Sequence, residues 1–210
     1  MLTPPLPDLI YGPLIPSGLR IEGDHFMLGS SRWLWKGSTE FRLPERVLTG
    51  ADIRPILTDR KAAGANLVRM LAMKANNTGY ELNPRALGYW VAVRETWATV
   101  GELGLFGEWC VFADTKRMMP DVGEQRDFYA RTIAELQPYA SFMLLELLNE
   151  DKHATQAIDA QAFPRPVGLL ASHGSGLSDV QPVKPLWDYA TYHARRSGGL
   201  AKICSNYSPY

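Results

Sequence analysis

The chain has 210 residues, of which 46% are hydrophobic and 21% are charged, as in an ordinary globular protein with a sizeable core. Lysine and arginine together number 22, as do aspartate and glutamate, so no overall field favours nucleic acid or an anionic membrane as a partner. No stretch approaches the ~18 apolar residues of a membrane span, and the N-terminus does not resemble a signal peptide, so we expect a cytoplasmic or otherwise soluble protein.

The N-terminal part of the chain predicts an extended segment followed by a hairpin. Residues 1–18 are rich in proline and predict an extended lead-in before a folded domain at 19–210. Apolar and polar residues alternate in 19–22 and 25–28 on either side of a Gly-Asp pair, a pattern typical of a β-hairpin. A first core strand is then expected to end near Glu40.

Beyond this strand, helix and strand patterns alternate. The expected helices lie between Asp52 and Gly64, at about 84–100, at about 123–136 and in a short stretch at 154–162. The expected strands lie at 66–71, 105–112, 142–149, 167–172 and 187–193. Repeated β-then-α order with nearly continuous apolar strands predicts an α/β fold whose parallel sheet is covered by helices.

Polar side chains lie in or at the ends of several predicted strands, where parallel α/β sheets bind their ligands. They are Glu40, Arg69, Asp114, Asn149, Glu150, His173 and His193. Together these residues are stronger evidence for a ligand-binding site than any one of them alone.

The segment Glu146-Leu147-Leu148-Asn149-Glu150 closes the apolar run that begins at Ser141. A charged carboxylate is unfavourable in an apolar setting, so the pKa of the carboxyl group rises and its neutral form is favoured. A carboxylic acid held partly protonated near neutral pH is what general acid catalysis requires. The alternative that stays open is a strand that simply ends in a polar loop.

The hairpin, the segment Gly64-Ala65-Asn66-Leu67-Val68-Arg69 and the segment 146–150 together resemble the retaining glycoside hydrolases of the TIM-barrel clan typified by the cellulase-like family 5. The resemblance implies a (β/α)8 TIM barrel, incomplete with about six βα units, behind an N-terminal β-hairpin. It implies hydrolysis of O-glycosidic bonds in a carbohydrate substrate. It also implies that Glu150 is the general acid/base, that Asn149 binds the sugar 2-hydroxyl and that Arg69 helps to hold the nucleophile carboxylate.

The sequence departs from the clan's pattern at two places. Asp151 follows Glu150 where the clan often has proline, and the chain stops at Tyr210, before the seventh strand that carries the clan's nucleophile. We therefore expect a truncated hydrolase that has lost its nucleophile with the missing part. Possible substitutes are Glu40, Glu108 and Asp114, although none matches the clan's position.

Further substrate-binding residues are predicted with open alternatives. His173 and His193 could donate to sugar hydroxyls or be ordinary strand-end histidines, and Trp35 could stack on a sugar ring or belong to the core. Glu40 is a further candidate at the end of the first strand. For Arg69 the alternative is a buried ion pair with Glu146.

No cofactor or metal is expected. Cys110 and Cys204 are the only cysteines, and Cys110, in an apolar strand, is expected to be a free buried thiol. The four histidines lack metal-ligand spacing. The segment 172–176 lacks the glycine offsets of a nucleophile elbow, and Asp179 stands where a dinucleotide loop needs its third glycine.

Two other functions stay open on the sequence. A non-catalytic carbohydrate-binding or interaction protein on a degenerate barrel is favoured by the missing nucleophile. The second open function is that of a different TIM-barrel enzyme, because a fold alone does not determine a function.

Overall fold

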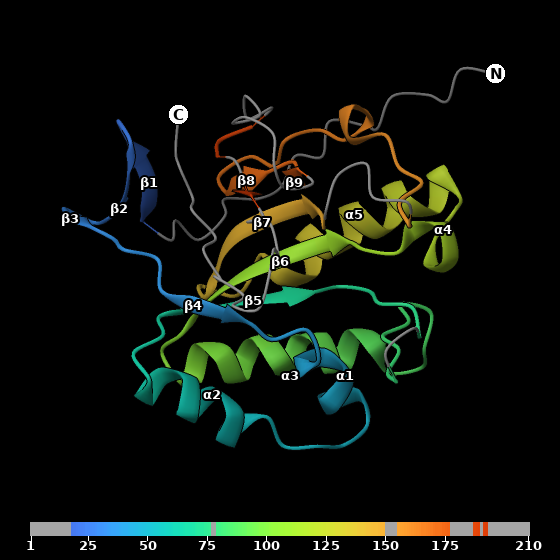
Figure 1. Cartoon of the computed structure of the whole chain (residues 1–210), viewed down its shortest axis with the longest axis horizontal. Coiled ribbons are helices and arrows are strands. Elements are labelled where there is room, and N and C mark those ends of the chain that lie inside the picture. The colour runs from blue at the N-terminus through green and yellow to red at the C-terminus, as the bar shows by residue number, and fades with distance from the viewer. Residues whose placement is uncertain (1–17, 77–78, 150–154, 177–186, 190, 193–210) are drawn as a thin grey trace, which may run out of the picture.

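The computed structural model describes residues 18–76, 79–149, 155–176, 187–189 and 191–192 (Figure 1). The strands are β1 (Leu19–Glu22), β2 (His25–Leu28), β3 (Ser31–Arg32), β4 (Gly37–Thr39), β5 (Leu67–Leu71), β6 (Phe106–Phe112), β7 (Phe142–Leu148), β8 (Leu170–Ser172), β9 (Ser175–Gly176) and β10 (Thr191–Tyr192). The helices are α1 (Leu43–Leu48), α2 (Arg54–Ala62), α3 (Tyr89–Glu102), α4 (Thr115–Met118), α5 (Val122–Leu136) and the 3₁₀ turn η1 (Ala160–Ala162).

The main sheet has five parallel strands in the order β4-β5-β6-β7-β8, which is also their order along the chain. Helix α2 connects β4 to β5, α3 connects β5 to β6, and α5 connects β6 to β7. This order never reverses, as it would in a doubly wound sheet, and it is the order found in a (β/α)8 barrel. The predicted α/β fold is confirmed, and the described sheet is part of a barrel.

The strand expected at 187–193 is shorter than predicted. Among the described residues of this range, the strand is β10, Thr191–Tyr192, and it pairs in parallel with β9 rather than with the main sheet. Asp188 interrupts it, because its carboxylate accepts the Ala171 N–H at 3.0 Å while its own N–H donates to the Ala171 carbonyl at 2.9 Å. A side chain thus takes the place of the carbonyl that a regular strand would offer.

Helix ends also differ from the sequence pattern. Helix α3 begins at Tyr89 rather than near residue 84, because Gly88 has a left-handed φ of 83° that a helix does not continue through. The helix expected at 154–162 is only the 3₁₀ turn η1 in the described residues. The hairpin agrees with expectation, with β1 and β2 paired in antiparallel register.

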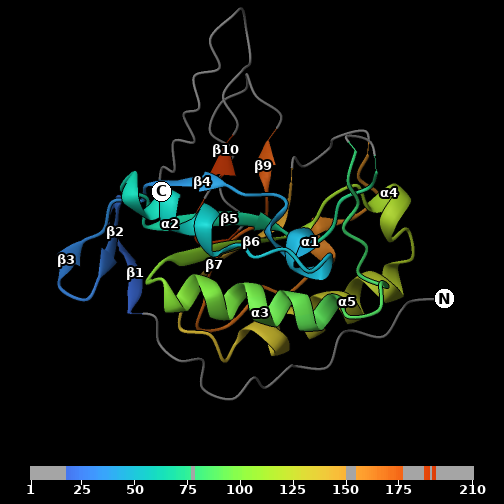
Figure 2. The same cartoon turned by 90° about the horizontal axis from the view of Figure 1, so that it is seen from below.

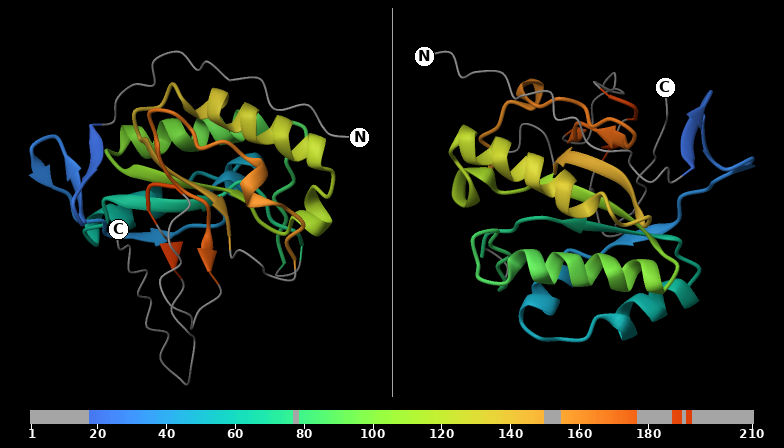
Figure 3. Two further views of the ribbon diagram at one scale, coloured as in Figure 1. Left: turned by 90° about the horizontal axis from the view of Figure 1, so that it is seen from above. Right: turned by 180° about the vertical axis from the view of Figure 1, so that it is seen from behind.

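The helices pack on the outer side of the sheet through large aromatic side chains. Trp97 of α3 lies over Gly107 of β6, where a Cβ atom would come within 2.3 Å of the indole ring. The Trp97 and Trp109 ring centroids are 5.9 Å apart, and Trp90 of α3 meets Phe128 of α5 at 5.4 Å. Figure 3 shows α3 and α5 along the sheet. None of the helices in the described part of the chain is both long and apolar enough for a membrane span.

A second apolar cluster closes the end of the sheet where the strands begin. Phe26 of the hairpin packs against Trp33 and Tyr189, with centroids 6.3 and 5.8 Å apart, and Trp33 packs against Phe106 at 6.1 Å. The hairpin lies at this end, and α4 lies at the opposite end, where the strands finish (Figure 2). The strand ends that could bind a ligand are therefore away from the hairpin.

Candidate active site

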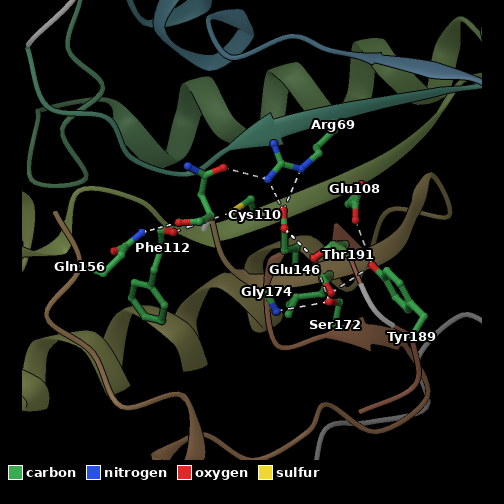
Figure 4. Close-up of polar contacts among 12 residues, drawn as sticks. Arg69, Glu108, Cys110, Phe112, Glu146, Gln156, Ser172, Gly174, Tyr189 and Thr191 are labelled. Carbon is green, nitrogen blue, oxygen red and sulfur yellow. Dashed lines mark hydrogen bonds and ion pairs between the residues drawn. The ribbon is translucent and has the colours of Figure 1, made fainter. Parts of the chain in front are cut away.

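The polar residues of the site come from alternate positions on neighbouring strands. Arg69 of β5 is in register with Glu108 of β6, and Cys110 of β6 is in register with Glu146 of β7. Alternate residues of a strand face the same side of a sheet, so these side chains share the inner side, opposite the helices. Figure 4 shows them converging from adjacent strands.

Arg69 and Glu146 form a buried ion pair. The Arg69 Nε donates to Glu146 Oε2 at 2.7 Å, and Arg69 Nη2 donates to the same oxygen. The Glu146 side chain has no exposed surface, and that of Arg69 is 7% exposed. The structure therefore contains the ion pair that the sequence left open as one role for Arg69.

The same guanidinium also reaches Asn149, at the C-terminal end of β7. Arg69 Nη2 donates to Asn149 Oδ1 at 3.1 Å. The Asn149 backbone is fixed as well, because its N–H donates to the Phe112 carbonyl at 2.9 Å and its carbonyl accepts from Gln156 Nε2 at 2.6 Å. Asn149, one of the predicted site residues, is thus held by hydrogen bonds to both its side-chain amide and its backbone.

Three residues that sequence reasoning missed complete the buried network. Thr191 donates from Oγ1 to Glu146 Oε1 at 3.0 Å, and Ser172 Oγ lies 3.2 Å from Thr191 Oγ1. The Tyr189 hydroxyl donates to Glu108 Oε1 at 3.0 Å. The alternate spacing of Tyr189 and Thr191 was the available signal in the sequence. Ser172 and Thr191 have small hydroxyl side chains in short strands, and such residues are common outside functional sites.

Cys110 lies in this network as a free, buried thiol, as expected. Burial raises its pKa well above the usual value, and the negative charge of Glu146 adds to that rise. The thiol is therefore neutral and unreactive near neutral pH. It fills space beside the ion pair.

Two predicted site residues are not brought to Asn149. Trp35 precedes β4 and packs against the apolar cluster at the hairpin end, and its role in stacking on a sugar ring stays a prediction. Glu40 follows β4, but its carboxylate binds Ser38 Oγ at 2.9 Å and Arg60 of α2, which turns it toward the helix layer. Its predicted contact with substrate stays a prediction.

The other predicted residues have mixed outcomes. His173 lies just beyond β8 and is only 5% exposed, which leaves little of its ring for a ligand. Glu150 and His193 lie outside the described residues. Their roles stay predictions.

The carboxylates considered as substitute nucleophiles all have partners within the fold. Asp114, in the left-handed region at φ 54°, accepts the Ala75 N–H at 3.1 Å and lies 3.6 Å from Lys74 Nζ. Glu108 is fully buried against Tyr189. Among the described residues, no three His, Cys, Asp or Glu side chains are grouped so that they could hold a metal ion.

No family model matches the sequence, and no curated protein does. A family 5 glycoside hydrolase from Bacteroides vulgatus matches the structure with a TM-score of 0.55 at 14% identity, over 83% of this chain and 43% of that one. An exo-β-1,4-mannosidase from Opitutaceae bacterium strain TAV5 matches with a TM-score of 0.50 at 18% identity, over 68% of this chain and 30% of that one. The chain has the fold of part of a TIM barrel.

The chain spans less than half the length of either barrel protein. In a TIM barrel, ligands bind at the C-terminal ends of the strands. Asn149 follows β7, the fourth strand of the five-stranded sheet, and therefore lies at that end. The expected incomplete barrel with its N-terminal hairpin is thus the observed fold.

Proposed function

We propose that this protein hydrolyses O-glycosidic bonds and that Glu150 is its general acid/base. The supporting observation is the fixed position of Asn149, the residue directly before Glu150. Asn149 ends the fourth parallel strand and is held by Arg69 at 3.1 Å and by the Phe112 carbonyl at 2.9 Å. A fixed amide at the ligand-binding end of a barrel is suited to orienting a sugar hydroxyl.

In the proposed reaction the bond between the anomeric carbon and the leaving oxygen breaks. Glu150 protonates the leaving oxygen and later takes a proton from the attacking water. Asn149 binds the sugar 2-hydroxyl through a hydrogen bond that strengthens as the oxocarbenium-like transition state forms. The second carboxylate that this chemistry requires is assigned to none of Glu40, Glu108 and Asp114, since each is bound within the fold.

The proposed substrate class is a β-linked carbohydrate, with β-mannosides as the first to test. The support is that one matched structure with a TM-score of 0.50 is an exo-β-1,4-mannosidase. The equal numbers of acidic and basic residues are compatible with such a neutral ligand.

The test is turnover of phenyl β-glycosides, whose leaving oxygen needs a proton, by the protein and by Glu150→Gln. This variant keeps the size of the side chain but removes its proton transfer, so turnover is expected to fall about 10²- to 10⁴-fold. The matched control is Glu102→Gln, because the Glu102 side chain is 58% exposed at the end of α3 and its carboxylate pairs with the exposed Arg54. Full activity in Glu150→Gln would contradict the proposal.

A titration with manno-oligosaccharides distinguishes the non-catalytic alternative. Binding without turnover by the unmodified protein supports a carbohydrate-binding function. Turnover that depends on Glu150 supports the hydrolase.

A further inference from the structure

A continuous chain of hydrogen bonds crosses four strands or strand ends on the inner side of the sheet (Figure 4). It runs from the Gly174 N–H to Ser172 Oγ at 3.3 Å, and from there to Thr191 Oγ1 at 3.2 Å. Thr191 contacts Glu146 at 3.0 Å. The Glu146–Arg69 pair then links this chain to Asn149.

The chemistry of each group fixes the direction of this chain. An ionised carboxylate only accepts, so the Thr191 hydroxyl must give its proton to Glu146. The single proton of Thr191 is then used, and Ser172 must donate to Thr191 while it accepts from the Gly174 N–H. Every hydroxyl therefore has one orientation.

Arg69 fixes the far end of the chain in the same way. A guanidinium only donates, so the Asn149 atom that faces it at 3.1 Å must be the carbonyl oxygen Oδ1. The Asn149 amide nitrogen is consequently turned away from Arg69. An asparagine held in this orientation offers N–H donors, rather than an acceptor, to a ligand.

The bend between β8 and β9 positions the end of the hydrogen-bond chain that begins at the Gly174 N–H. Gly174 has a φ of 142°, and a Cβ atom there would lie 2.7 Å from the Leu148 carbonyl oxygen. The bend therefore packs directly on the end of β7, one residue before Asn149. This close approach keeps Ser172 and Thr191 in line with Glu146.

We propose that Thr191 and Ser172 are positioning residues that act through Glu146 and Arg69 to orient the Asn149 amide toward a sugar hydroxyl oxygen. This proposal rests on the proposed hydrolase function for its ligand, but the orientation itself can be measured without turnover. Both hydroxyls belong to buried residues.

The decisive variant is Thr191→Val, which keeps the shape of the side chain and removes the donor to Glu146. The matched control is Thr96→Val, since Thr96 is also buried but its hydroxyl donates to the Ala92 carbonyl at 2.8 Å within α3. Thr191→Ser restores the donor and should rescue the effect. Ser172→Ala tests the next link and provides a second variant if Thr191→Val folds poorly.

The first readout is NMR of the Arg69 Nε–H and the Asn149 side-chain amide, assigned by their loss in Arg69→Lys and Asn149→Asp. We expect Arg69 Nε–H exchange to become about tenfold faster in Thr191→Val, because Glu146 loses a hydrogen bond to its charge. The Asn149 amide resonances should shift as well. Thr96→Val should leave both signals unchanged.

The second readout is steady-state kinetics on the phenyl β-glycoside. We expect kcat to fall about tenfold in Thr191→Val while KM changes about twofold at most, with recovery in Thr191→Ser. If the unmodified protein turns over no glycoside, the proposed function fails while the NMR comparison still decides the orientation. Unchanged Arg69 and Asn149 signals in folded Thr191→Val and Ser172→Ala would overturn the inference.

Discussion

Arg69 and Glu146 show how a charged pair can lie inside the sheet of this protein. Both side chains are almost completely buried, and the second carboxylate oxygen is bound by Thr191 at 3.0 Å. An ion pair in such surroundings adds little net stability, but loss of one partner leaves an uncompensated buried charge. The pair is thus more important for geometry than for stability.

At this scale we predict the effect of Arg69→Met on unfolding. Glu146 would remain buried without its cation, so the free energy of unfolding should fall by about 3 to 5 kcal/mol. The control is Arg54→Met, whose partner Glu102 is exposed, and which should change it by about 1 kcal/mol at most. Urea unfolding of both variants provides the measurement.

The double variant Arg69→Met/Glu146→Met adds a second check. Removing both charges should recover much of the loss, because no buried charge is left unpaired. A double variant less stable than Arg69→Met alone would show that the charge itself is not the cause.

Helix α3 and strand β6 depend on a close contact that only glycine permits. The Trp97 indole covers Gly107, and the side chains of Trp97 and Trp109 are fully buried. The absence of a side chain at Gly107 is what lets the helix approach the strand. The helix layer in turn holds β6 beside β5 and β7.

We predict that Gly107→Ala destabilises the protein by about 1 to 3 kcal/mol, since the added methyl group would overpack against the indole. The control in the same layer is Gly101→Ala on α3, where the added Cβ would meet only Ser141 side-chain atoms, 3.3 Å away at the nearest. That change should be close to neutral because alanine also favours the helix. Thermal unfolding followed by circular dichroism compares the two, and equal losses would contradict this role of Gly107.

Sequence periodicity was sufficient to predict most of these elements, and their ends depended on contacts that it does not encode. The strands β5, β6 and β7 are long, apolar runs, so their pattern is unambiguous. By contrast, residues 187–189 are not a strand because the Asp188 carboxylate binds the Ala171 N–H. That contact joins residues 17 positions apart and has no local signal.

The sequence pattern likewise indicated only some residues of the candidate site, because the others are defined by contacts between distant parts of the chain. Arg69 and Asn149 stand out as polar residues in apolar strands, and the structure brings them together. Trp35 was assigned to the site by its chemistry alone, yet it precedes its strand and lies at the hairpin end. The hydroxyl of Thr191 matters only through its contact with Glu146, 45 residues away in sequence.

At the scale of the whole molecule, the described residues form a singly wound parallel sheet whose two ends are lined by different kinds of side chain. The hairpin and its aromatic cluster close the end where strands begin. Polar residues held by buried hydrogen bonds occupy the inner side toward the other end. In TIM barrels, ligands bind at the end where the strands finish.

Glu150 is proposed to donate a proton to the leaving oxygen, and the dependence of the rate on the leaving group tests this role most directly. A 2,4-dinitrophenyl β-mannoside has a leaving group that departs without protonation, whereas a methyl β-mannoside needs the proton. We predict that Glu150→Gln lowers kcat/KM about 10²-fold or more for the methyl glycoside but less than about tenfold for the dinitrophenyl glycoside. An equal loss for both substrates, or no loss for either, would contradict the account.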